Sequence, residues 1–297
     1  MKSLYSFIII VFRTLIKWRK YKPLSKYPFG HFYTPIVSKA EIIEFENQIW
    51  EEANQHNISG INLNLDQQLF LLEEFVQYYP EMPFGAEKTG SQRYCFNNGA
   101  YSYTDGIVLY SFIRHFKPKR IIEIGSGHSS AVMLDTRETF VNDIKLTFIE
   151  PYPKYLNRII KDNDRLNCEV LEKKVQNVQL NKFQELEHDD FLFIDSSHVS
   201  KTGSDVNYEI FKILPALNPG VIIHFHDIFY PFEYPKSWVS EGRNWNENYL
   251  LRAFLSYNDQ FEIILFSHYM HQHHKDAFKQ MPLTYKNTGG NLWIRKK

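Results

Sequence analysis

The chain has 297 residues, which allows one large α/β domain with extensions or two small domains, and 43% of its residues are hydrophobic, enough for a sizeable core. Its 34 basic and 34 acidic residues cancel, so the excess of clustered cations on which nucleic-acid binding depends is missing, and we expect no nucleic-acid partner. The two cysteines, Cys95 and Cys168, are too few for a disulfide framework or a zinc site, which fits a cytoplasmic protein.

Residues 4–22 are apolar and basic. An apolar run over residues 7–12 precedes a set of basic residues, Arg13, Lys17, Arg19, Lys20 and Lys22. The run is much shorter than the roughly 20 residues that a membrane-spanning helix needs. Read as a helix, the segment suits peripheral contact with an anionic membrane; alternatively, it packs on the domain or on a second subunit of a homo-oligomer. We expect an N-terminal helix within residues 1–30, with both interpretations open.

Residues 31–100 read as a helical extension. A loop rich in Pro, Gly and aromatic residues covers residues 26–35, and helical spacing then runs from residue 39 to residue 79. The spacing is interrupted over residues 56–64, where Gly60 and several asparagines indicate a turn.

From residue 101 onward, helices alternate with short apolar strands. Uninterrupted runs rich in Ile, Val and Phe indicate parallel strands buried on both faces. These runs cover residues 120–125, 145–150, 168–172, 190–195 and 220–227. Two further runs, 261–266 and 291–296, are joined by a polar loop and are expected to form an antiparallel edge. The prediction for residues 101–297 is a doubly wound, Rossmann-like α/β domain with a mostly parallel seven-stranded sheet.

A glycine-rich turn, EIGSGHSS, follows the first strand, where doubly wound sheets bind their ligands. Gly125 and Gly127 permit a tight turn and close approach of the backbone to a cofactor. A dinucleotide site favours a third glycine at position 130, where this chain has Ser130. Glu123, two residues before the first glycine, would repel a pyrophosphate but suits a cofactor that carries ammonium and sulfonium groups.

Glu150 ends the second strand, at roughly the distance of 20 to 30 residues beyond the glycines where an acid accepts hydrogen bonds from ribose hydroxyls. The blocks EIGSGHSS, FIEPYP and FIDSSH together resemble the class I S-adenosylmethionine-dependent methyltransferases, from residue 101 to the C-terminus. Residues 189–238 resemble a bacterial subgroup that acts on small molecules.

This resemblance implies S-adenosyl-L-methionine as the cofactor. It places the glycine-rich turn at the methionine end and Glu150 at the ribose. Many members carry an acid after the third strand to meet the adenine; here Lys174 stands near that place, and Gln176 is the adenine candidate. The cofactor-binding candidates are Glu123, Gly125, Ser126, Gly127, Ser129, Ser130, Glu150, Gln176 and Asp195.

Acids and histidines converge at the ends of the fourth and fifth strands. In one interpretation, Asp195, Asp227 and His226 hold a divalent metal ion that orients a substrate oxygen and lowers its pKa. Catechol O-methyltransferase-like members are similar in placing acids at these two strand ends, but they add an amide side chain where this chain has Ile228. In the other interpretation no metal is used, and His198 or His226 is a general base, with Asp195 as the third catalytic candidate.

Two further stretches are weaker candidates. The sequence HYMHQHHKD, residues 268–276, is expected to be a solvated or lid loop rather than a metal site. Residues 230–250 are expected to form an acceptor-binding lid. Its candidate stacking residues are Tyr234, Trp238, Arg243 and Trp245.

The leading hypothesis is an S-adenosylmethionine-dependent methyltransferase that acts on a small molecule or glycan precursor. Oxygen is the expected methyl acceptor, because the acids and histidines at the strand ends suit deprotonation of a hydroxyl group. Two alternatives stay open: a metal-dependent oxygenase or hydrolase on the same fold, and a non-catalytic cofactor-binding scaffold.

Overall fold

The computed structural model describes residues 25–90 and 92–297. The chain divides into two units between Asn47 and Gln48. In the first unit a turn-rich segment leads into α2 (Lys39–Glu51), a helix that buries none of its residues and whose last residues, from Gln48 on, belong to the second unit. The membrane-contact prediction for residues 4–22 lies outside the described residues, and the bounds 1–30, 31–100 and 101–297 stay a prediction. Within the described ranges, no helix combines the length and the apolar character that crossing a membrane requires.

A single seven-stranded sheet forms the centre of the second unit, and it confirms the predicted fold. Its strands are β1 (Arg120–Ile124), β2 (Lys145–Ile149), β3 (Cys168–Leu171), β4 (Phe191–Ile194), β5 (Ile222–Phe225), β6 (Phe261–Phe266) and β7 (Leu292–Lys296). The spatial order is β3-β2-β1-β4-β5-β7-β6. The first five strands are parallel, and β7 runs antiparallel to both of its neighbours. Apolar strands such as β4 and β5 are buried along their whole length, as their uninterrupted patterns predict.

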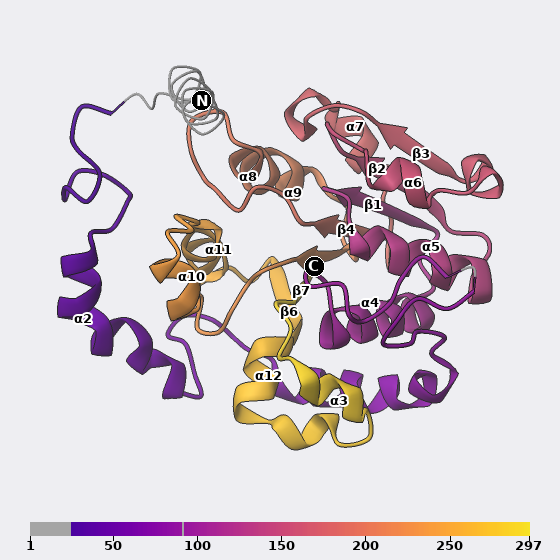
Figure 1. Cartoon of the computed structure of the whole chain (residues 1–297), viewed down its shortest axis with the longest axis horizontal. Helices are drawn as coiled ribbons and strands as arrows, with labels where there is room; N and C mark the ends of the chain where they lie inside the picture. Colours follow the sequence, from indigo (N-terminus) through magenta and orange to yellow (C-terminus); the bar gives the residue numbers. More distant parts are fainter. Residues whose placement is uncertain (1–24, 91) are drawn as a thin grey trace, which may run out of the picture. The chain divides into compact units, whose positions relative to one another are not determined.

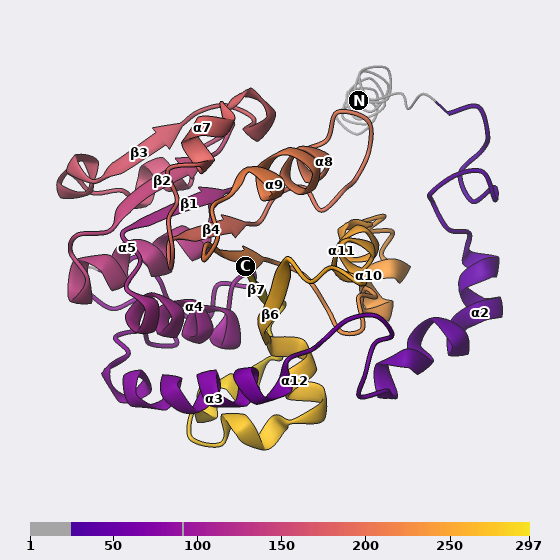
Figure 2. The same ribbon diagram turned by 180° about the vertical axis from the view of Figure 1, so that it is seen from behind.

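Helices cover both sides of this sheet. On one side lie α4 (Tyr103–Phe116) and α5 (His128–Phe140); on the other lie α8 (Asp205–Tyr208), a π-helical turn (Glu209–Ile213) and α9 (Leu214–Ala216), as Figures 1 and 2 show. The ring of Phe112 in α4 stacks on Trp293 of β7, with ring centroids 3.8 Å apart. The remaining α-helices of this unit are α3 (Leu65–Phe75), α6 (Leu156–Ile159), α7 (Leu180–Phe183), α10 (Lys236–Ser240), α11 (Glu247–Leu255) and α12 (Ser267–His273).

The helical extension is joined to the edge of the sheet. Gln68 of α3 accepts a hydrogen bond from the backbone N–H of Phe266 at 2.7 Å, and the Asn64 amide donates to the carbonyl of Ile263 at 3.1 Å. These side chains satisfy backbone groups on the free edge of β6, which would otherwise offer a template for another strand. Residues 48–100 therefore share a compact unit with the sheet.

The prediction of a polar loop between the last two strands is wrong, because residues 267–273 form α12. Tyr269, Met270 and His271 are buried in it. The imidazole of His271 stacks on Phe278 with ring centroids 3.9 Å apart, and burial lowers the pKa of His271 to about 4. A neutral histidine thus packs as an aromatic ring, so a pattern that counts histidine as polar misses this helix.

The strand order reverses between β1 and β4, and this is where the fold opens a crevice. Gly125 follows β1 with a φ of +81°, in the left-handed region that favours glycine. A Cβ atom at this position would lie 1.9 Å from the carbonyl oxygen of Asp195, the residue that follows β4. The crevice therefore depends on a backbone contact that only glycine permits.

We predict that Gly125→Ala lowers the free energy of unfolding by about 2 to 4 kcal/mol, the sum of a left-handed backbone penalty and an overpacking penalty. Urea denaturation of the full chain measures this. Gly127→Ala is the matched control, because a Cβ there meets nothing within 4 Å, and it should cost less than about 1 kcal/mol. Equal losses in the two variants would contradict the role given to the Asp195 contact.

Candidate functional site

A cavity of about 380 Å³ opens at the carboxyl ends of β1, β2 and β4. Gly125, Glu150, Gln176 and Asp195, four of the predicted cofactor-binding residues, line it. Gln176 donates from Nε2 to the carbonyl of Gly203 at 2.9 Å, which joins the segment after β3 to the loop before α8. A volume of this size suits a small organic ligand, and the position is the one where doubly wound sheets bind cofactors.

Glu150 is fixed at the rim of this cavity. Its Oε2 accepts a hydrogen bond from the backbone N–H of Ser126 at 3.2 Å, and its Oε1 accepts one from that of Tyr152 at 2.7 Å. Each carboxylate oxygen has two lone pairs, so each can accept one further hydrogen bond. The side chain is thus oriented before a ligand arrives and can still accept from two ribose hydroxyls.

Glu123 lies beneath the glycine-rich turn and is fully buried. Its two oxygens accept hydrogen bonds from the hydroxyls of Ser129 and Ser130, and the Ser130 oxygen in turn accepts from the N–H of Gly127 at 3.1 Å. In these contacts Glu123 holds the turn and the start of α5 rather than lining the cavity. Burial raises the pKa of Glu123 to about 8, although the two serine hydroxyls oppose the rise.

A second group of residues meets at the ends of β4 and β5. The Nε2 atom of His198 lies 3.4 Å from Oδ1 of Asp195 and 3.6 Å from Oδ2 of Asp227. One donor atom from each of these three residues lies within 4.8 Å of the others, and among residues 25–90 and 92–297 they form the one such group of His, Cys, Asp or Glu side chains. The sequence-based metal set had His226 in place of His198. The Nε2 of His226 lies 3.6 Å from Oδ1 of Asp227.

Two of these three residues have a strained backbone. His198 has a φ of +59° and Asp227 a φ of +56°, both in the left-handed region that residues other than glycine seldom occupy. Each such residue costs roughly 1 to 3 kcal/mol and persists only where its surroundings hold it, most often at functional sites. For His198 the hold is visible, because its carbonyl accepts hydrogen bonds from the N–H groups of Asn246 at 3.1 Å and Glu247 at 3.2 Å.

Three acidic side chains hold the segment between Asp195 and His198. Glu209 accepts from the hydroxyl of Ser196 at 3.1 Å, and Asp205 accepts from that of Ser197 at 2.6 Å. Glu247 Oε2 lies 2.9 Å from Nδ1 of His198. These acids sit on α8, the π-helical turn and α11, so sequence reasoning missed them, and no spacing in the chain marks them as partners of this segment.

The acids also control the protonation of the site. Burial alone would lower the pKa of His198, but the carboxylates of Asp195 and Glu247 outweigh it and raise this pKa well above its usual value. Burial would raise the pKa of Asp195, yet His226 and His198 hold it below its usual value. Before any ligand binds, the cluster is therefore a charged hydrogen-bonded network.

The two histidines of β5 and its end differ in role. His224 is fully buried between the rings of Phe193 and Trp293, at 3.9 and 4.5 Å, and burial lowers its pKa well below the usual value. His226 packs against Tyr101 at 4.9 Å. Burial would lower the pKa of His226, but the nearby acids, chiefly Asp227, raise it.

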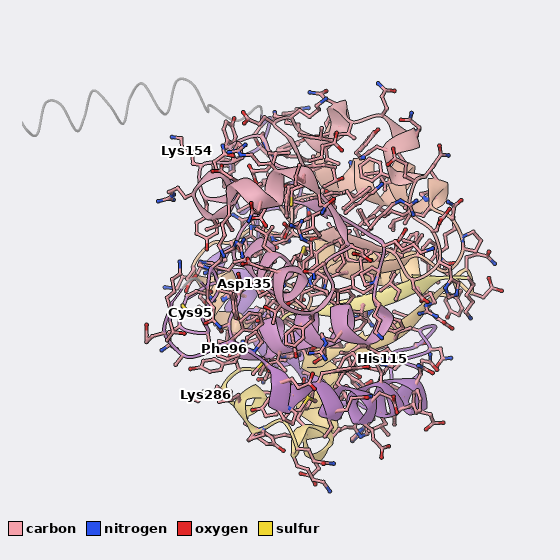
Figure 3. All side chains as sticks on the ribbon, turned by 90° about the vertical axis from the view of Figure 1, so that its right-hand side faces the viewer. Cys95, Phe96, His115, Asp135, Lys154 and Lys286 are labelled. Atoms are coloured by element: carbon pink, nitrogen blue, oxygen red, sulfur yellow. The ribbon has the colours of Figure 1, made fainter. Side chains whose placement is uncertain are left out.

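The segment that carries Tyr101 is fixed to α5. Asp135 accepts from the N–H groups of Arg93 at 2.8 Å and Tyr94 at 2.9 Å, so this acid lies beside the loop of Cys95 and Phe96 (Figure 3). The hydroxyl of Tyr94 then donates to the carbonyl of Tyr101 at 2.7 Å.

The aromatic residues of the expected lid divide into two kinds. Tyr234 is buried and packs in the core. The guanidinium of Arg243 lies 4.1 Å from the ring centroid of Trp238, and the ring of Trp245 lies 4.4 Å from that of His198. An aromatic and cationic surface thus adjoins the acid–histidine cluster.

Comparison with known proteins agrees with this picture. A family model described as a methyltransferase domain matches residues 122–228. An uncharacterized protein of Archaeoglobus fulgidus is 39% identical over 168 residues, which cover 54% of this chain and 74% of that protein.

Several solved structures are similar at low identity. The S-adenosylhomocysteine-bound methyltransferase PaMTH1 of Podospora anserina is 17% identical, with 92% of this chain and 99% of that chain covered and a TM-score of 0.43. The O-methyltransferase TomG from Streptomyces achromogenes, in complex with S-adenosylmethionine, is 15% identical, with coverage of 76% and 89% and a TM-score of 0.43. A structure of CmcI with Mg and S-adenosylmethionine is 13% identical, with coverage of 66% and 72% and a TM-score of 0.40.

The chain belongs to the class I S-adenosylmethionine-dependent methyltransferase superfamily. It is an S-adenosylmethionine-dependent methyltransferase. This membership agrees with the sheet of five parallel strands and its antiparallel C-terminal strand.

We predict that burial of Glu123 makes the protein without ligand less stable as the pH rises. Between the ordinary pKa of 4.5 and the folded value of about 8, the folded state holds a proton that the unfolded state has lost. Stability should therefore fall by about 1.4 kcal/mol per pH unit in this window relative to Glu123→Gln, which keeps the shape of the side chain and one acceptor oxygen but does not titrate.

Urea denaturation of both proteins from pH 5 to pH 8.5 measures the difference. Glu172→Gln removes an exposed glutamate and should follow the wild-type curve. Parallel curves for wild type and Glu123→Gln would show that Glu123 titrates as an ordinary acid.

Proposed function

We propose that the protein transfers the methyl group of S-adenosylmethionine to a hydroxyl oxygen of a small molecule or glycan precursor. The observation that carries the proposal is the position of Asp195, which lines the cofactor cavity and also belongs to the cluster with His198 and Asp227. A methyl donor bound in this cavity would lie next to a group of proton-binding side chains at the same strand end.

The reaction requires three changes at the acceptor and the donor. The acceptor O–H bond breaks, a new bond forms between this oxygen and the methyl carbon, and the bond from that carbon to sulfur breaks. The electron pair of the carbon–sulfur bond stays on sulfur, so S-adenosylhomocysteine is the second product. Because a neutral hydroxyl is a weak nucleophile, a positioned base raises the rate, and the cavity supplies alignment of the reacting atoms.

His226 is the proton acceptor that this arrangement favours. Both ring nitrogens of His198 are engaged, Nδ1 with Glu247 and Nε2 with the two aspartates. The Nδ1 atom of His226, in contrast, has no hydrogen-bond partner within residues 25–90 and 92–297. This Nδ1 atom is buried, so the proton from the acceptor hydroxyl would reach the ring at Nε2, which lies 3.6 Å from Oδ1 of Asp227.

The cluster also fits a divalent cation, which Asp195, His198 and Asp227 would hold. Two carboxylates and an imidazole with a carboxylate behind it form a donor set that suits Mn, Fe or Zn. When bound, such an ion lowers the pKa of a hydroxyl group that it contacts. Ile228, at the position of the amide in catechol O-methyltransferase-like proteins, is fully buried, and His198 supplies the third donor instead.

A ring-shaped acceptor fits the surface next to this cluster. Trp238 and Trp245 lie nearly perpendicular, with ring centroids 5.4 Å apart, and Arg243 lies over the first of them. Indole faces bind aromatic rings and the apolar faces of sugars, and the guanidinium adds affinity for an acidic substituent.

The test separates cofactor binding from transfer. Wild type should bind S-adenosylhomocysteine in calorimetry, and Glu150→Ala should weaken this binding about 10- to 100-fold through loss of charged hydrogen bonds to the ribose. His226→Gln should bind it within about twofold of wild type, yet lose at least about 100-fold in transfer of radiolabelled methyl to a small-molecule extract of the source organism.

Glu172→Ala removes an exposed acid that does not line the cavity, and it is the control for both measurements. Wild type that binds no S-adenosylhomocysteine, or His226→Gln with full transfer activity, would overturn the proposal.

We further propose that the first unit contacts an anionic membrane surface. Its described part exposes the aromatic side chains of Phe29, Phe32 and Tyr33, which are 60%, 73% and 66% accessible. In the sequence they follow the apolar and basic residues 4–22. Aromatic rings favour the membrane interface, and clustered cations favour anionic lipid headgroups.

The full chain should co-sediment with vesicles that contain phosphatidylglycerol and much less with vesicles of phosphatidylcholine alone. Phe29→Ser combined with Phe32→Ser should weaken binding several-fold, because less apolar area enters the interface. Phe211→Ser, an exposed phenylalanine of the second unit, should have no effect. Failure of the wild type to sediment, with a dimer in light scattering, would favour subunit packing instead.

A further inference from the structure

We propose that Glu247 is a positioning residue for His198 and that its carboxylate fixes which ring nitrogen of His198 faces Asp195 and Asp227. The inference rests on the proposed function, because it concerns the same cluster. It assigns a role to a residue of α11, which is distant from His198 in the sequence and which no sequence pattern identified as its partner.

The contact between the two side chains is buried. Glu247 is in the first turn of α11, and its side chain is 1% exposed, whereas that of His198 is 6% exposed. Oε2 of Glu247 lies 2.9 Å from Nδ1 of His198. On the other side of the ring, Nε2 lies 3.4 Å from Asp195 and 3.6 Å from Asp227.

The start of α11 holds the backbone of His198 as well as its ring. The His198 carbonyl accepts from the N–H groups of Asn246 and Glu247, at 3.1 and 3.2 Å. The ring of Trp245 covers the imidazole at 4.4 Å. Three consecutive residues thus enclose His198, whose φ of +59° needs such support.

The chemistry of the contact gives the direction of the hydrogen bond. An ionised carboxylate can only accept, so Nδ1 of His198 carries the hydrogen when Glu247 is ionised. With Nδ1 occupied, Nε2 is the atom that faces the two aspartates and that can hold a cation between them. Without Glu247 the ring is free to flip and to present either nitrogen, and carboxylates in this position commonly orient metal-binding histidines.

Glu209 provides a matched comparison within the same site. It is as buried as Glu247, but it accepts from the hydroxyl of Ser196 rather than from His198. Removal of either side chain takes away one buried carboxylate, and only removal of Glu247 takes away the partner of Nδ1.

The experiment uses the full chain with 15N-labelled histidine and no added metal. Wild type should show a slowly exchanging Nδ1–H proton for His198, assigned by its loss in His198→Gln. The proton should persist in Glu209→Leu and in Glu247→Gln, whose amide oxygen still accepts, and should disappear in Glu247→Leu. In electron paramagnetic resonance titrations with Mn²⁺ alone, Glu247→Leu should bind about 10- to 100-fold more weakly than wild type, and Glu209→Leu within about threefold.

The inference is overturned if Nδ1 of His198 carries no proton in wild type, or if Glu247→Leu keeps both the proton and the Mn²⁺ affinity. Near-ultraviolet circular dichroism checks that each variant folds. If Glu247→Leu does not fold, Glu247→Asp takes its place, because aspartate withdraws the carboxylate from His198 by one methylene. Absence of methyl transfer by wild type would overturn the proposed function but would leave the Nδ1–H result unchanged.

Discussion

The contact between Gly125 and the carbonyl of Asp195 is the constraint on which the site depends. It brings the ends of β1 and β4 together at the point where strand order reverses, and a Cβ atom at Gly125 has no room there. One end of this contact leads into the glycine-rich turn, and the other leads into the segment that ends at His198. Residues after both of these strands line the cavity, together with residues after β2 and β3, and the acid–histidine cluster adds Asp227 from the end of β5.

Buried carboxylates hold both sides of that junction. Glu123 binds the hydroxyls of Ser129 and Ser130 beneath the turn, while Glu209 and Glu247 bind Ser196 and His198 behind the cluster. A buried acid is costly unless its oxygens are hydrogen-bonded, so each of these partners is part of the condition for folding. These buried acids lie where loops must be rigid. Neither the glycine-rich turn nor the segment after β4 has a regular ladder of backbone hydrogen bonds to hold it.

Much of the fold followed from the sequence, because strands buried on both faces appear as uninterrupted apolar runs. All seven strands and the placing of Glu150 and Asp195 at strand ends agree with those runs. The features that the sequence did not predict depend on contacts between distant segments of the chain. Glu247 reaches His198 only through the position of α11, and α12 was missed because its histidines pack as neutral aromatic rings.

His198, in place of the predicted His226, forms the cluster with Asp195 and Asp227. Strand β5 ends at Phe225, and the Nε2 atom of His226 lies 3.6 Å from Oδ1 of Asp227, whereas Nε2 of His198 lies within 3.6 Å of both aspartates. His226 instead packs against Tyr101, on the side of the sheet where His224 also lies. The third donor of the cluster is His198, which has a left-handed backbone with a φ of +59°. The two histidines therefore differ in their surroundings: the ring of His198 lies between Glu247 and the two aspartates, whereas that of His226 packs against Tyr101.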